Sequence, residues 1–125
     1  DFASYVGPFC NTGIMLLEST IERDPEMVQA LVTAFEESSR LTYSDPAFAK
    51  EVARKEFADL PPAVVDAAID AQLQYLIPAQ TAVVQRDQWD NLMSMQLYLG
   101  NIKGTIPFEE IIDNSFAEKA VAALG

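Results

Sequence analysis

The sequence predicts a mainly helical chain that also carries one buried β-strand, and this combination points to a larger α/β protein. Residues 14–17 (IMLL) are four large apolar residues between Gly13 and the polar residues 19–20 (ST). A run that is apolar at every position is typical of a strand covered on both faces, as in a parallel sheet. The rest of the chain has helical patterns, and only residues 83–84 (VV) offer a second short extended piece. A buried strand without neighbours leaves its backbone groups unsatisfied, so we expect one piece of a larger α/β protein, or a chain that borrows strands from a second copy.

The composition excludes several classes of protein. The 125 residues include 8 basic and 19 acidic side chains, and the net charge of −11 would repel a nucleic-acid backbone. Half of the residues are hydrophobic, which argues against disorder. Cys10 is the single cysteine, so no intrachain disulfide can form. No apolar stretch approaches the ~20 residues that span a membrane. The sequence has no signal peptide, and because it starts at Asp1 rather than at methionine we expect it to be trimmed.

Two helices begin with the same signal, an aspartate followed by a proline. Asp24 is a good N-cap, Pro25 suits the first helical position, and this helix is predicted to end near residues 41–44. Asp45 and Pro46 repeat the signal. Apolar residues at helical spacing mark the faces that we expect to be buried: Met27, Val28, Leu31, Val32 and Phe35 in the first helix, and Phe48, Ala49, Val52, Ala53 and Phe57 in the second.

Further helical segments follow. A third helix is predicted from residues 61–62 (PP) to Pro78, and a fourth over residues 86–99 with Gly100 as its stop. Residues 107–112 predict a short helical turn. The last helix is predicted to use a capping box, with Ser115 as N-cap and Glu118 three residues later. In the fourth helix Trp89, Leu92, Met93 and Leu99 are expected to face inward.

Few residues of the chain could carry out catalysis. Histidine is absent, which removes most metal sites and nucleophile–base pairs, and Cys10 has no histidine partner. Asp66 and Asp70 share a helix face, as do Glu109 and Asp113, but the Glu-x-x-His element of di-metal bundles is missing. We therefore interpret these carboxylates as solubilising groups, and we predict no metal, no cofactor and no catalytic residue.

The loop at residues 7–12 is the candidate binding site. Ligands of open α/β folds gather beside strand ends, where loops offer free backbone groups. Phe9 could stack on a ligand, Asn11 and Thr12 could hydrogen-bond in both directions, and Cys10 would form a small polarizable wall. The alternative, equally supported by composition, is a turn in which residues 11–13 (NTG) merely redirect the chain.

Four segments in this order resemble the C-terminal part of periplasmic solute-binding proteins of ABC importers. They are residues 7–13 (GPFCNTG), 21–28 (IERDPEMV), 43–47 (YSDPA) and 107–116 (PFEEIIDNSF). The most similar group handles nitrate, taurine and alkanesulfonates, and thiamine-pyrimidine precursors. Each segment alone is a weak signal, because Asp-Pro helix starts are common in proteins. Four matching segments in the right order over nearly the whole chain are fairly specific to this group.

The resemblance implies a two-lobed, type II periplasmic-binding-protein fold whose N-terminal two-thirds lie outside this sequence. Residues 1–19 would then be an interlobe crossing loop with the buried strand, and residues 20–125 the helical portion of a lobe. Phe9, Cys10, Asn11 and Thr12 would face a small organic or anionic solute between the lobes. The protein would work in the periplasm or outside the cytoplasmic membrane, with a lipid anchor as one option, and would deliver the solute to a membrane permease.

The sequence is also consistent with two other functions and with association of two copies of the chain. A pyrimidine-synthase-like enzyme of thiamine biosynthesis resembles the chain too, but it has a cysteine-rich loop where this sequence has only Cys10. Its catalytic histidine would also have to lie outside these residues. The other alternative is a freestanding helical interaction module. Since the predicted strand lacks a neighbour, we also expect that the isolated chain exchanges strands or helices with a second copy.

Overall fold

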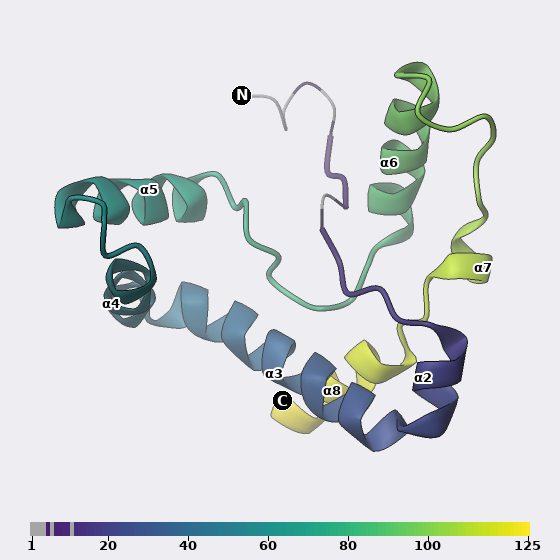
Figure 1. Cartoon of the computed structure of the whole chain (residues 1–125), viewed down its shortest axis with the longest axis horizontal. Helices are drawn as coiled ribbons and strands as arrows, with labels where there is room; N and C mark the ends of the chain where they lie inside the picture. Colours follow the sequence, from purple (N-terminus) through teal and green to yellow (C-terminus); the bar gives the residue numbers. More distant parts are fainter. Residues whose placement is uncertain (1–4, 6, 11) are drawn as a thin grey trace.

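The computed structural model describes residue 5, residues 7–10 and residues 12–125, and in this part of the chain every regular element is a helix (Figure 1). The helices are α2 (Glu18–Arg23), α3 (Pro25–Ser44), α4 (Pro46–Glu56), α5 (Pro62–Gln74), α6 (Arg86–Tyr98), α7 (Phe108–Ile111) and α8 (Ser115–Leu124). In Figure 1, α3 lies across α8, the α4–α5 hairpin lies at one end of α3, and α2 lies at its other end, with α7 and α6 above α2 in this view.

The predicted fold class is wrong. The described residues contain no strand and no sheet, so neither a strand-bearing chain nor a two-lobed α/β fold is observed. Residues 14–17 are irregular and exposed, and Met15 is 93% exposed. Residues 83–84 are irregular as well. The run of apolar residues indicates side chains that favour burial, but a strand also needs a neighbouring strand for its backbone, and the described residues provide none. The expected boundary at residue 19 falls inside α2 and stays a prediction.

The two Asp-Pro helix starts are confirmed. Asp24 accepts a 3.0 Å hydrogen bond from the backbone N–H of Met27, and Asp45 accepts one of the same length from Phe48. In both helices the proline takes the first position, where its missing N–H costs nothing. The helix α3 ends at Ser44, as predicted.

The other helix ends differ in part from the prediction. Gly100 stops α6 in a left-handed conformation with φ of 74°, as expected. The capping box predicted at Ser115 is wrong, because Ser115 is already helical and Asn114 precedes it without a side-chain cap. At the end of α5, Leu76 rather than Pro78 breaks the helix, with φ of 52°. The N–H of Ile77 then donates to the carbonyl of Gln72, which completes a Schellman-like end.

The buried core is small and divided among the helix pairs. Val28 of α3 and Ala117 and Ala120 of α8 are buried where these two helices pack. Ala53 and Val65 are buried in the α4–α5 hairpin, and Met93 is buried in α6. Several positions predicted to be buried are exposed: Met27, Phe35, Phe48, Val52, Phe57 and Leu99.

The whole chain is open for its size. Its accessible surface is 8999 Å², whereas a compact monomer of this length has about 6,600 Å². The excess of roughly 2,400 Å² arises because the helix pairs each cover only one side of their partners. The apolar faces of the helices are therefore only partly buried by these 125 residues.

The linker, residues 75–85, joins the α4–α5 hairpin to α6 and is held by side chains rather than by a backbone ladder. The Tyr43 hydroxyl donates a 2.5 Å hydrogen bond to the carbonyl of Pro78. The Asn114 side chain pairs with both backbone groups of Val84, accepting from its N–H at 3.0 Å and donating to its carbonyl at 2.9 Å. These contacts fix the linker against α3 and the start of α8.

Glu36 is the third and most buried anchor of the linker. Its side chain is 1% exposed and accepts hydrogen bonds from Thr81 Oγ1 at 2.9 Å and the N–H of Ala82 at 2.6 Å. Arg40 Nε donates to the other carboxylate oxygen at 2.7 Å, and the same guanidinium donates to the carbonyl of Gly125. Burial acts to raise the pKa of Glu36, but the hydrogen bonds from Ala82, Arg40 and Thr81 and the charge of Arg40 outweigh it, so the pKa lies below its ordinary value.

Candidate functional site

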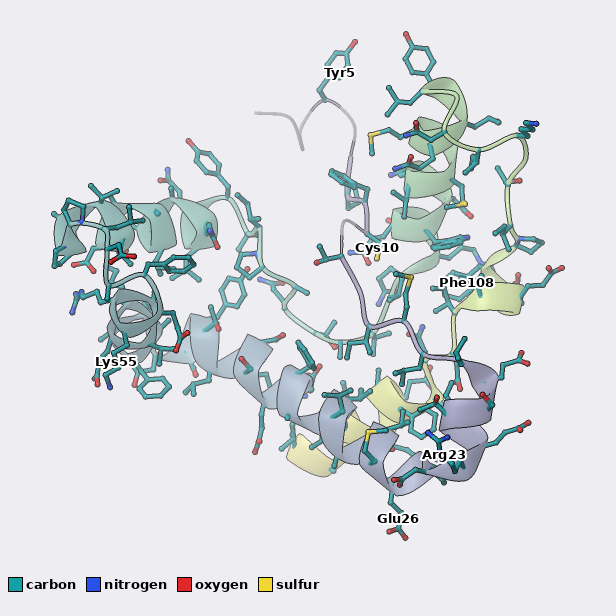
Figure 2. The ribbon with its side chains drawn as sticks, viewed as in Figure 1. Tyr5, Cys10, Arg23, Glu26, Lys55 and Phe108 are labelled. Carbon is teal, nitrogen blue, oxygen red and sulfur yellow. The ribbon has the colours of Figure 1, made fainter. Side chains whose placement is uncertain are left out.

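The candidate binding loop belongs to a segment that we name the strap, residues 7–10 and 12–17, whose first part runs beside α6 (Figures 1 and 2). Two hydrogen bonds attach it to α6. The N–H of Cys10 donates to the carbonyl of Gln88 at 3.2 Å, and Asn91 Nδ2 donates to the carbonyl of Pro8 at 2.8 Å. The strap is thus attached at its first half, while residues 12–17 continue as an irregular segment to α2.

Gly7 is required where the strap first meets α6. Its φ of 76° lies in the left-handed region that side-chain-bearing residues rarely adopt. A Cβ atom at this position would also lie 3.2 Å from Asn91 Nδ2, the group that holds Pro8. The glycine therefore allows the close approach on which the attachment of the strap depends.

The structure places the described members of the predicted site along one short stretch of the strap. Phe9 and Cys10 are half-buried and Thr12 is exposed. Cys10 Sγ donates a long hydrogen bond of 3.7 Å to the carbonyl of Thr12. Asn11, the remaining predicted site residue, lies outside the described residues. These side chains are uncharged, and none of them lines either of the two pockets found on the described part of the chain.

Cys10 is not activated as a nucleophile. Partial burial raises the pKa of its thiol above the ordinary value, and its side-chain hydrogen bond goes to a carbonyl rather than to a base. A thiol in this state is mostly protonated at neutral pH. The chemistry that this loop supports is binding through backbone groups, a hydroxyl and an aromatic ring.

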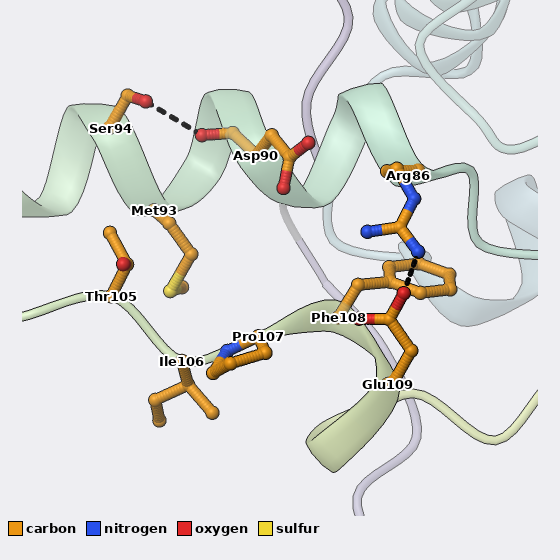
Figure 3. A pocket seen from close by; sticks show the side chains of 9 residues that line it. All are labelled: Arg86, Asp90, Met93, Ser94, Thr105, Ile106, Pro107, Phe108 and Glu109. Carbon is orange, nitrogen blue, oxygen red and sulfur yellow. Dashed lines mark hydrogen bonds and ion pairs between the residues drawn. The ribbon is translucent and has the colours of Figure 1, made fainter.

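A pocket of about 310 Å³ on α6 was not predicted from the sequence (Figure 3). Met93 and Ser94 line it from α6, and Thr105, Ile106 and Pro107 line it from the chain before α7. Trp89, predicted to be core, is half-buried, and its Nε1–H donates to the carbonyl of Ile106 at 2.9 Å. Residues 107–116, one of the four segments that resemble solute-binding proteins, lie in this region, but their sequence does not indicate a pocket.

Two charged groups at this pocket, Arg86 and Glu109, pair with each other. Arg86 forms an ion pair with Glu109 and lies 4.9 Å from the centroid of the Phe108 ring. The hydrogen bond from Arg86 holds the pKa of Glu109 below its ordinary value. Asp90, also on the rim, adds negative charge. An incoming anion would have to displace Glu109 and would meet the charge of Asp90, so the pocket disfavours an anion.

The pocket and the strap lie on different faces of α6. Arg86, Asp90 and Met93 follow the three- and four-residue spacing of one helix face. Gln88 and Asn91, which hold the strap, follow the same spacing on another face, which continues to Tyr98. The structure therefore does not bring the predicted site residues into the pocket.

Two further kinds of functional feature, a metal cluster and a membrane-spanning helix, are absent from the described part of the chain. No group of three or more cysteine, aspartate or glutamate side chains there could hold a metal ion. Among the described residues no helix combines the length and the apolar character needed to cross a bilayer. No protein-family model, no curated protein and no solved structure matches this chain.

Proposed function

We propose that the protein carrying this chain is the extracytoplasmic solute-binding component of an ABC importer, which binds a small organic or anionic solute and delivers it to a membrane permease. The four sequence segments described above support this proposal. The structural observation that carries it is the strap, an uncharged loop attached to α6 in which Thr12 is exposed and Phe9 and Cys10 are half-buried.

An uncharged loop suits a small solute on a chain of charge −11. Backbone N–H groups and a hydroxyl can bind an oxyanion without a countercharge, and an aromatic ring can stack on a flat ligand. Because Thr12 is exposed and Phe9 and Cys10 are only half-buried, the loop provides only one wall of a binding site. A second wall has to come from other polypeptide, as is usual for sites that enclose most of a small ligand.

A second candidate function, a helical interaction module, is favoured by the surface excess of the chain. Such a module would bind another protein and no small solute. The enzyme alternative has less support, because the raised pKa of Cys10 and the lack of a histidine leave no activated nucleophile in the described residues.

The test is solute binding by the intact gene product, measured by isothermal titration with nitrate, taurine, an alkanesulfonate and a thiamine-pyrimidine precursor. For the solute that binds, Asn11→Ala and Thr12→Val should each raise the dissociation constant about ten- to hundredfold, since each leaves a polar group of the bound solute unpaired. Phe9→Ala should weaken binding of a flat ring more than binding of a small anion.

Thr42→Val on α3 is the matched control, because the Thr42 hydroxyl donates only to the carbonyl of Ser38 within its own helix. Melting temperatures of all variants are compared with that of the parent to separate binding from folding. If no solute binds, or if no strap variant shifts affinity by more than about twofold, the proposed function of the loop is wrong.

A further inference from the structure

The pocket on α6 has an apolar floor beneath a charged rim. Met93 is only 8% exposed, and its side chain reaches from α6 toward the segment before α7, where Ile106 and Pro107 form the opposite wall (Figure 3). Ser94 and Thr105 add hydroxyl groups to the lining. The volume of about 310 Å³ lies at the lower end of the range of roughly 300–1,000 Å³ that small-molecule sites occupy. The pocket therefore suits a small ligand with an apolar body.

The rim of this pocket is negative. Arg86 is paired with Glu109, whereas within the described part of the chain the Asp90 carboxylate has neither an ion pair nor a hydrogen bond (Figure 3). The charge of Asp90 acts together with the hydrogen bond from Glu109 to raise the pKa of Arg86, but one guanidinium cannot neutralise two carboxylates. One positive and two negative groups leave the rim with an excess of negative charge, on a chain whose net charge is −11. Such a field raises the local concentration of cations.

We propose that the pocket between α6 and the segment before α7 binds a small organic cation, with its ammonium group beside Asp90 and its apolar body over Met93. A hydrogen bond between two charged groups is stronger than one between neutral groups. Asp90 can form it without giving up a partner, because the described residues supply none. The apolar body displaces water from Met93, Ile106 and Pro107, which is favourable in proportion to the apolar area covered.

Other kinds of ligand fit the pocket less well. A metal ion prefers several oxygen ligands, and the described residues contain no group of three or more side chains that could hold one. An anion would meet the charges of both Asp90 and Glu109. A neutral ligand would cover the Asp90 carboxylate without supplying a positive charge to it. A cation that carries an apolar group is the class that uses both the floor and the rim.

This site is separate from the strap. The pocket and the strap lie on different faces of α6, and none of the described strap residues lines the pocket. The inference therefore goes beyond the proposed solute binding and does not depend on it.

Trp89 provides the readout for the experiment. It is the single tryptophan of the chain, and its Nε1–H donates to the carbonyl of Ile106, a residue of the pocket wall. Its fluorescence is titrated with three probes that share a phenyl group and differ in charge: phenethylamine, 2-phenylethanol and phenylacetate. We expect phenethylamine to bind at least about tenfold more tightly than either of the other two.

Asp90→Asn tests the charge, since it preserves the shape of the side chain. It should raise the dissociation constant of phenethylamine about tenfold and remove the preference over 2-phenylethanol. Asp87→Asn is the matched control, because Asp87 is an exposed aspartate of the same helix that does not line the pocket. Ser94→Leu tests the location. It partly fills the pocket and should weaken phenethylamine and 2-phenylethanol alike, while the hydroxyl that it removes donates only to the carbonyl of Asp90 within α6.

Far-UV circular dichroism checks that the variants stay helical. The proposal is overturned if phenethylamine does not bind, if the three probes bind equally, or if Asp90→Asn and Asp87→Asn have the same effect. Loss of phenethylamine binding in Thr12→Val would also overturn it, because the probe would then lie at the strap. Failure of nitrate, taurine or the other solutes to bind leaves these results unchanged, so the two proposals can fail separately.

Discussion

The Glu36 network offers the sharpest test of how this fold is held together. Glu36→Gln preserves the shape of the side chain but replaces one carboxylate oxygen with an NH₂ donor. In the parent both oxygens accept, one from Arg40 and the other from Thr81 and Ala82. The Thr81 hydroxyl can rotate, whereas the N–H of Ala82 and the guanidinium of Arg40 can only donate. One donor in the variant must therefore face another donor.

The magnitude follows from burial. A buried donor left without a partner costs about 1–3 kcal/mol, so Glu36→Gln should lower the free energy of unfolding by that amount. Glu36→Ala removes the whole carboxylate and leaves Arg40 without its partner, and it should cost about 3–5 kcal/mol. Either value is a large share of the stability of a domain of this size. Glu37→Gln is the matched control, because Glu37 is the exposed neighbour on the same helix.

The assay is urea unfolding followed by circular dichroism at one fixed protein concentration. The pKa of Glu36 is lower in the folded chain than its ordinary value, so its stabilising contribution is complete above the unfolded pKa of about 4.3 and is lost as the pH falls through the folded value. The parent should therefore lose stability in acid more steeply than Glu36→Gln. An unfolding free energy of Glu36→Gln within about 0.5 kcal/mol of that of Glu37→Gln would refute the reasoning.

Three further predictions concern the linker, the end of α5 and the strap. Asn114→Ala should lower the unfolding free energy by about 1–3 kcal/mol in the same urea assay, because both backbone groups of Val84 lose their partner. Asn101→Ala is the control and should have little effect, because the Asn101 side chain bonds only to Gln96 on the surface. Leu76→Gly should raise the melting temperature, since glycine relieves a left-handed conformation that costs about 1–2 kcal/mol. Leu60→Gly is the control and should lower the melting temperature, because φ is not positive at Leu60. A lower melting temperature for Leu76→Gly would contradict the reasoning. Alkylation of Cys10 by iodoacetamide should have its midpoint at a higher pH than alkylation of free cysteine, because burial raises the pKa of the thiol, and a midpoint at or below that of free cysteine would show that the thiol is activated.

Helix starts were predictable because their signals are local. An aspartate before a proline determines its own hydrogen bond three residues later, and both such starts have the expected geometry. The start of α8 was not predictable in the same way, because Asn114 is engaged with Val84, thirty positions away in the sequence. The left-handed Leu76 could not be foreseen either, since leucine carries no preference for that conformation.

Burial was predicted least well, for a physical reason. Helical spacing correctly identifies which side of α3 or α4 is apolar, but not how much of that side the rest of the chain can cover. Val28 and Ala53 are buried while Phe35 and Phe48 on the same stripes are exposed. The candidate loop could be located from its composition, whereas its attachment to α6 depends on Asn91, which has no sequence signal. The pocket at Arg86 was missed because an ion pair between α6 and α7 joins residues 23 positions apart.

The side-chain anchoring of the linker has a consequence for the order of folding. Its three anchors, Glu36, Tyr43 and Asn114, lie 30 to 46 positions away from the linker groups that they bind. Contacts between such distant positions form slowly, because the loop entropy is lost before the contacts compensate for it. The α4–α5 hairpin, whose partners are near in sequence, can form first. We therefore expect the linker amides to gain protection from hydrogen exchange last, in the same kinetic step that brings α8 onto α3.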